Sequence, residues 1–73
     1  MSLADVPHSI PVRVTGVRNG GPISHRLMEM GFIRGAEVKV IRRAPLGDPL
    51  QVRIGDYDLS VRSSEAELID VAR

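Results

Sequence analysis

The chain has 73 residues, no cysteine, and ten basic against nine acidic side chains, which gives a net charge of +1. This length allows one domain with a thin core, and the lack of cysteine excludes disulfides and thiolate metal sites. The small net charge argues against nucleic acid or anionic lipid as a partner. With no secretory signal and no run of ~20 apolar residues, the protein is expected to be intracellular and not to insert into a membrane.

The first segment, residues 1–9, is predicted to be an extended arm anchored by Leu3 and Val6. Prolines at positions 7 and 11 disfavour helix in the residues before them, which keeps this part extended. Residues 11–17 then alternate apolar and polar side chains, which predicts a first strand.

A short helix is predicted after a turn at residues 18–21, starting at Pro22, whose missing N–H costs nothing in the first helical turn. Gly31 is expected to end this helix in a left-handed conformation, and Phe32 to fold back onto its last turn. One apolar stripe should face the core, formed by Ile23, Leu27 and Met30.

Residues 37–43 form the next predicted strand, with Val38 and Val40 facing the core. Ile41 falls on the polar side of this pattern, which leaves three interpretations open: it is covered by the helix, it lies at a bulge, or it contacts a partner. Residues 44–49, with the sequence Ala-Pro-Leu-Gly-Asp-Pro, consist mainly of turn-forming types and are expected to form a loop.

The most regular local pattern is a hairpin with a two-residue connection at Gly55 and Asp56, with glycine first as a type II′ turn prefers. This connection fixes the register, so that Ile54 lies opposite Tyr57. On the other face, Arg53 opposes Asp58, an opposite-charge pair. One face of the hairpin is expected to be wholly apolar and consists of Leu50, Val52, Ile54, Tyr57, Leu59 and Val61.

The C-terminal segment starts with a capping box in which Ser64 is the N-cap and Glu67 reaches back, so one helical turn is predicted. Residues 69–71 resume a strand-like alternation, and this strand is expected to lie beside the first. The chain is therefore predicted to be mainly β, with one domain over residues 1–73. The domain is a small, partly open barrel of about five strands with one short buttressing helix and a C-terminal helical turn.

Residues suited to catalysis or metal binding are few. The sequence has no phosphate-binding loop, and neither His8 nor His25 has a nucleophile or a metal-motif partner at a suitable spacing. No catalytic residue, cofactor site or metal site is therefore predicted. Stacking aromatics are nearly absent, which argues further against nucleic acid.

Five blocks of the sequence are similar to the FeoA family of bacterial ferrous iron transport: RLMEMGF (26–32), GAEV (35–38), RRAPLGDP (42–49), VR (61–62) and EAELI (65–69). The resemblance extends over about residues 3–71 and departs at residues 7–10, where many members have a glycine turn. It implies an SH3-like barrel and a non-enzymatic, cytoplasmic accessory protein. It also implies that the protein supports ferrous iron uptake by binding the cytosolic part of the membrane permease FeoB.

A second function is kept as an alternative. The C-terminal SH3-like domain of DtxR-type metal-dependent repressors resembles FeoA, so the chain is alternatively a regulatory module. Such a module would act through self-association, or through binding of a metal or a repressor. A homo-oligomer is compatible with the exposed sheet edges of a small barrel, but no residue specifies one from the sequence alone.

The candidate partner-binding residues lie in the helix with the loop that follows it, and in the second strand with its following loop. Each has an alternative structural explanation, because Met30 and Phe32 suit a core and Leu46 would be covered if its loop folded onto the barrel. Arginine at three of these positions could also act in trans on a partner's GTPase, although ordinary surface positions explain them equally well. The set is Arg26, Met28, Met30, Phe32, Ile33, Ile41, Arg42, Arg43 and Leu46.

Overall fold

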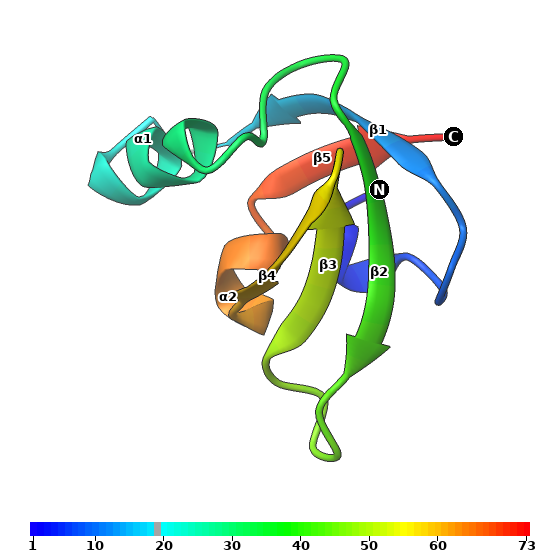
Figure 1. Ribbon diagram of the computed structural model, residues 1–73. Coiled ribbons are helices and arrows are strands. Elements are labelled where there is room, and N and C mark those ends of the chain that lie inside the picture. The colour runs from blue at the N-terminus through cyan, green and yellow to red at the C-terminus, as the bar shows by residue number, and fades with distance from the viewer. Residues whose placement is uncertain (19) are drawn as a thin grey trace.

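The computed structural model of the chain describes residues 1–18 and 20–73, which form a five-stranded antiparallel sheet with short helices around it (Figure 1). The strand order is β4-β3-β2-β1-β5. The strands are β1 (Val12–Val17), β2 (Glu37–Arg43), β3 (Leu50–Ile54), β4 (Tyr57–Val61) and β5 (Ile69–Ala72). The helices are the 3-10 turn η1 (Leu3–Asp5), α1 (Pro22–Glu29) and the single turn α2 (Ser63–Ala66). The mainly β prediction is confirmed, and part of the predicted turn at 18–21 lies outside the described residues.

The core is built from alternating positions of the strands. Val12 and Val14 of β1, and the corresponding valines of β2 and β3, are at most 1% exposed. Since branched aliphatic side chains pack well on a pleated surface, the sheet needs few aromatics to fill its concave side. Phe32 is fully buried there and has the largest side chain of the fully buried residues.

The hairpin of β3 and β4 has the predicted register, with Ile54 opposite Tyr57 and Arg53 opposite Asp58. Gly55 has a φ of 57°, as the first central position of a type II′ turn requires. The predicted apolar face is present, with the six residues paired as expected, but Tyr57 at its end is 54% exposed. The ring lies at the open end of the sheet, where its hydroxyl donates a hydrogen bond of 2.8 Å to the Met30 carbonyl.

Helix α1 ends as predicted. Gly31 has a φ of 115°, its N–H donates to the Met28 carbonyl at 3.0 Å, and the Phe32 N–H donates to the Leu27 carbonyl at 3.2 Å. These two bonds form a Schellman motif, and Phe32 and Leu27 are both fully buried. The helix thereby delivers Phe32 into the core.

The predicted apolar stripe of α1 is wrong at Ile23, which is 48% exposed, while Ser24 is buried. The Ser24 hydroxyl donates to the Arg18 carbonyl at 2.7 Å, which fixes the first turn of α1 against the end of β1. The buried line of the helix therefore runs through Ser24 and Leu27. The helix projects to one side of the sheet (Figure 1), so Ile23 remains in solvent.

The two terminal segments differ in detail from the predictions. Residues 1–9 are not extended throughout, because Leu3–Asp5 form a 3-10 turn whose Leu3 is fully buried, as is Val6 after it. Helix α2 begins at Ser63, and the carboxylate that reaches back belongs to Glu65, which accepts the Arg62 N–H at 2.9 Å. Ser64 is therefore inside the helix, so the predicted Ser64–Glu67 box is wrong. The last strand pairs with β1, as predicted.

Candidate partner-binding surface

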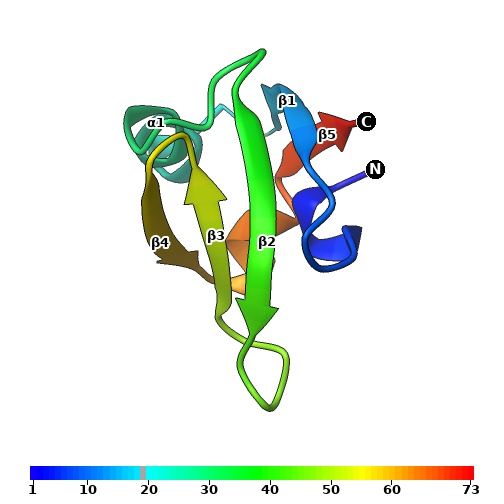
Figure 2. The same cartoon turned by 45° about the vertical axis from the view of Figure 1, so that its right-hand side comes forward.

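The nine candidate partner-binding residues lie at two ends of β2. One group belongs to α1 and the loop that follows it, before β2 starts at Glu37, and the other to the end of β2 and the β2–β3 loop. A strand of this length is about 20 Å long. Figure 2 shows the two loops at opposite ends of the long β2 strand. The structure therefore does not bring the predicted residues together into one patch.

At the helix end, two of the predicted residues are unsuitable for contact. Phe32 is fully buried, with 0% of its surface accessible to solvent, so its prediction as a partner-binding residue is wrong. The Schellman motif of α1 places it in the core, where the chain has no other phenylalanine to fill the space. Met30 is half-buried and packs against the same core, leaving only part of its side chain available.

The exposed apolar side chains near α1 include Ile23, which was predicted to face the core, and Tyr57, which was predicted on the apolar face of the hairpin. Met28 and Ile33 are 41% and 55% exposed, as expected of contact residues. Ile23 and Tyr57, at 48% and 54%, are exposed too. Tyr57 follows a tight turn at the start of an edge strand, where a phenol can pair its hydroxyl and leave part of its ring in water, which is the signal that could have identified it.

The Arg26 side chain already has a partner within the chain. Its guanidinium forms an ion pair with the carboxylate of Glu65 in α2, which is the same carboxylate whose other oxygen accepts the Arg62 N–H. Arg26 thus connects the protruding helix to α2 while keeping 61% of its side chain exposed. An arginine held in this way is available to a partner only along its exposed edge.

At the other end of β2, Leu46 is the most exposed of the large apolar residues, at 96%. Its loop is closed by two backbone bonds, from the Gly47 N–H to the Ala44 carbonyl at 2.7 Å and from the Ala44 N–H to the Pro49 carbonyl at 3.1 Å. The loop therefore presents Leu46 from a hydrogen-bonded frame, and the leucine does not fold onto the barrel.

Asp48 fastens this loop to the start of α2. Its carboxylate accepts the Ser63 N–H at 2.9 Å, and the Ser63 hydroxyl donates to the Gly47 carbonyl at 2.9 Å. The Ser63 N–H stabilises the charged carboxylate and so lowers the pKa of Asp48, with a smaller lowering from the Arg62 guanidinium at 3.4 Å.

The remaining predicted residues at this end of β2 differ in their exposure and in their contacts. Arg43 points inward and donates to the carbonyls of Ala4 and Val6 at 3.0 and 2.8 Å, so it holds the N-terminal segment, and its assignment to a partner surface is corrected. Ile41 is half-buried where the β2–β3 register shifts, which selects the bulge among its three interpretations. Arg42 is exposed.

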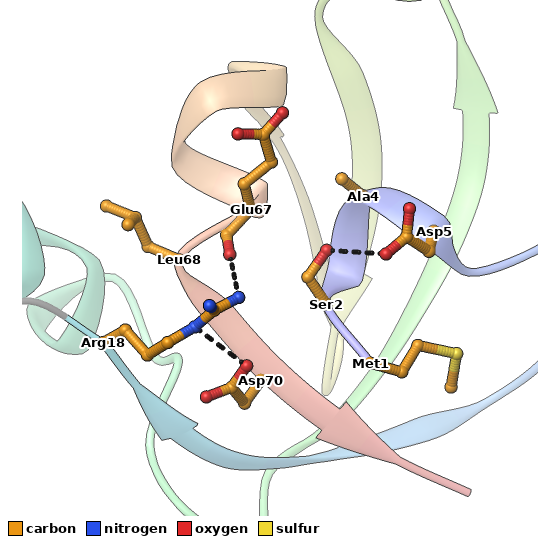
Figure 3. A pocket seen from close by; sticks show the side chains of 8 residues that line it. All are labelled: Met1, Ser2, Ala4, Asp5, Arg18, Glu67, Leu68 and Asp70. Atoms are coloured by element: carbon orange, nitrogen blue, oxygen red, sulfur yellow. Dashed lines mark hydrogen bonds and ion pairs between the residues drawn. The ribbon is translucent and has the colours of Figure 1, made fainter.

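An open hollow of about 680 Å³ lies between η1, α2 and β5. Figure 3 shows Arg18 at its centre, where the guanidinium donates to the Glu67 carbonyl at 2.7 Å and pairs with the Asp70 carboxylate at 3.1 Å. On its other side the Ser2 hydroxyl donates to Asp5 at 3.1 Å. Sequence periodicity could not predict this hollow, because its residues come from three separate stretches of the chain, 1–5, 18 and 67–70. Of its charged side chains, Arg18 and Asp70 form an ion pair, and the Asp5 carboxylate accepts the Ser2 hydroxyl.

Within the described part of the chain, no group of three or more histidine, aspartate or glutamate side chains lies close enough together to hold a metal ion. His8 and His25 are both exposed and lie on different segments. Among residues 1–18 and 20–73, no helix is long and apolar enough to span a bilayer.

The sequence profile of the FeoA domain matches residues 1–73. The chain belongs to the FeoA family. The solution structure of iron(II) transport protein A from Clostridium thermocellum superposes with a TM-score of 0.93 at 35% identity, over 99% of this chain and 44% of that one. FeoA from Stenotrophomonas maltophilia, described as an SH3 domain protein and crystallised in complex with zinc, gives 0.86 at 33% identity, over 97% and 88%. These likenesses establish the SH3-like fold of this FeoA protein.

A curated relative is a fusion of Fe(2+) transport protein A with the Fe(2+) transporter FeoB, from Porphyromonas gingivalis. It is 35% identical over 71 residues, which are 97% of this chain and 8% of the fusion protein. The chain thus spans a small part of that relative and less than half of the Clostridium thermocellum chain. FeoA is an accessory family of ferrous iron transport, and the fusion links it to FeoB.

Proposed function

We propose that this FeoA protein is a non-enzymatic, cytoplasmic accessory protein of ferrous iron uptake that acts by binding the cytosolic part of a FeoB-type permease. The observation that carries the proposal is the Porphyromonas gingivalis fusion, in which a segment matching 97% of this chain is covalently joined to FeoB. Fusion fixes two proteins at a one-to-one ratio and at high effective concentration, which favours segments that function in contact.

The exposed apolar side chains supply two surfaces for such contact. Leu46 is the strongest candidate for a contact residue, because it is 96% exposed in the free protein. Fully burying a leucine side chain against a partner contributes about 1.5–3 kcal/mol to the free energy of binding. Its loop is already closed by hydrogen bonds, so little conformational freedom would be lost on binding. The helix end, with Met28 and Ile33, is the second surface.

The test is a titration of the isotope-labelled protein with the FeoB permease of the same organism, followed by backbone amide shifts at physiological salt. Binding should shift amides at residues 44–49, at residues 30–33, or at both. Leu46→Ser and Ile33→Ser each remove one exposed apolar group, and because the two lie at opposite ends of β2, each is the control for the other.

The proposal fails if FeoB produces no shifts and deletion of the protein leaves ferrous iron uptake unchanged. A parallel titration with Fe²⁺ under anaerobic conditions separates the metal-binding regulatory alternative, because saturable shifts around His8 or His25 would indicate that the protein itself binds the ion. A binding experiment with a DtxR-type repressor in place of FeoB separates the other form of that alternative.

A further inference from the structure

The sheet has two edge strands, β5 and β4, and the N-terminal residues cover the edge of β5 but not that of β4. The outer edge of β5 is covered by the N-terminal residues, since Ser2 forms a bridge with Asp70 and the Val71 N–H donates to the Met1 carbonyl at 2.8 Å. Among residues 1–18 and 20–73, the other edge strand, β4, pairs with β3 alone, and it forms the margin of the sheet in Figure 2. An exposed edge of this kind is a template for pairing with another strand.

The outward backbone groups of β4 can be identified from its register. A two-residue turn makes Ile54 and Tyr57 a hydrogen-bonded pair, and such pairs alternate along the strand. The N–H and C=O groups of Asp58 and Ser60 therefore point away from β3. Over residues 1–18 and 20–73, no other backbone or side-chain group bonds to them. Both residues are exposed.

The β4 edge also lacks the usual features that prevent strand pairing. Its sequence, Tyr-Asp-Leu-Ser-Val, contains no lysine, proline or glycine. The one charge in the strand, on Asp58, is neutralised by Arg53, whose guanidinium donates to both carboxylate oxygens at 2.7 and 3.2 Å. Arg53 lies on β3, so the pair leaves the outer edge free.

We infer that β4 pairs antiparallel with β4 of a second copy of this chain, about a two-fold axis beside Leu59. In this register each Asp58 faces Ser60 of the second copy as a hydrogen-bonded pair, so all the outward groups of both residues are used. Leu59 then faces Leu59 of the second copy across the axis, where side chains approach most closely.

Charge complementarity selects this register. It places Asp56 of each copy opposite Arg62 of the other, twice by symmetry. Among the described residues no ion pair involves the Asp56 carboxylate. The Arg62 guanidinium pairs with Asp48 of its own chain at 3.4 Å through one nitrogen, and its side chain is 70% exposed, so its remaining N–H donors can reach Asp56 of the second copy. Sliding the strands by two residues in one direction sets Asp58 against Asp58 of the second copy. Sliding them in the other direction moves Asp58 beyond the end of the second β4. Each shift loses hydrogen bonds or opposes like charges.

The interface is short, so the dimer should be weak and reversible, detected at protein concentrations of about 0.1–1 mM. Sedimentation equilibrium over that range, together with the concentration dependence of the Asp58 and Ser60 amide shifts, measures it. We expect Asp56→Arg and Arg62→Asp each to weaken the dimer about tenfold or more, since each acts twice, and the double variant to restore it.

The matched controls are Glu67→Arg and Arg73→Asp, which change the net charge equally but lie away from β4 and should leave the dimer unchanged. Ser60→Pro removes an outward N–H that bonds nothing within the described chain, and an edge strand tolerates proline at such a position, so a folded monomer is expected. A wild-type protein that stays monomeric at 1 mM, or a dimer insensitive to both the charge exchange and Ser60→Pro, would overturn the inference.

Discussion

Gly31 is the position where a single methyl group should have the largest effect outside the core. Its φ of 115° is one that residues with a side chain rarely adopt. A Cβ added there would lie 3.0 Å from the Tyr57 hydroxyl and 3.6 Å from Cγ2 of Ile54. Gly31→Ala therefore combines backbone strain at the end of α1 with displacement of the tyrosine that closes the open end of the sheet.

The two costs can be estimated separately. Holding alanine at this φ costs about 1–3 kcal/mol. Displacing Tyr57 breaks its 2.8 Å hydrogen bond to the Met30 carbonyl, worth about 0.5–1.5 kcal/mol. We expect the free energy of unfolding to fall by about 2–4 kcal/mol, which for a chain of this size lowers Tm by about 10 °C or more. A core this small supplies roughly 3–5 kcal/mol in total, so the variant should be close to unfolding at 37 °C.

Gly35→Ala and Tyr57→Phe separate the contributions. Gly35 has a φ of 91° and nothing within 4 Å of its Cβ direction, so its substitution carries the backbone cost alone. In a Tyr57→Phe background, Gly31→Ala should cost about as much as Gly35→Ala, because no hydroxyl is left to displace. Urea unfolding followed by far-UV circular dichroism measures all four. If Gly31→Ala costs no more than Gly35→Ala in the wild-type background, the Tyr57 contact has no energetic role and the reasoning is refuted.

Three further predictions concern the loop, the N-terminal segment and the core. The lowered pKa of Asp48 contributes stability that is present above its ordinary value of 3.8 and lost as pH falls through the lower folded value, so Asp48→Asn should flatten the fall in stability on the acid side; an unchanged profile contradicts this. Arg43→Met removes the donors to the Ala4 and Val6 carbonyls, and should cost about 1–3 kcal/mol and speed amide exchange in residues 1–6, while Arg42→Met, at an exposed neighbour, should do neither. Phe32→Ala should cost about 3–5 kcal/mol and leave the protein largely unfolded by circular dichroism; a folded variant would show that Phe32 is not the centre of the core.

The parts of the fold that the sequence predicted are those determined within a few residues. The β3–β4 register follows from a two-residue turn with glycine first, and the end of α1 follows from Gly31 and Phe32. Both depend on hydrogen bonds between near neighbours, which composition and spacing specify directly. The neighbour relation of β5 and β1 was also predicted, because a small barrel has few places to put its last strand.

The parts that it missed depend on where whole elements lie. Ile23 has the helical spacing of a core residue, but α1 is fastened by the Ser24 hydroxyl with another line facing inward. Arg43 has the pattern of a solvent-facing strand residue, yet the N-terminal segment folds over it and uses its donors. Both contacts join one element to another, and the apolar periodicity within a single helix or strand carries no information about them.

The proposed dimer bears on the separation of the two candidate FeoB-binding surfaces. In one copy, Leu46 and Ile33 lie at opposite ends of β2, but β4 links those ends, because Tyr57 contacts the end of α1 and Val61 pairs with Leu50 beside the β2–β3 loop. Antiparallel pairing of two β4 strands sets Val61 of one copy opposite Tyr57 of the other. The Leu46 loop of one copy and the α1 end of its partner then lie at the same end of the assembly.

A single FeoB surface that requires both sites would therefore bind the dimer better than the monomer, and Ser60→Pro should weaken FeoB binding although it alters neither site. Equal FeoB affinity for wild type and Ser60→Pro, with Leu46→Ser and Ile33→Ser both impaired, would show instead that one copy reaches both contacts.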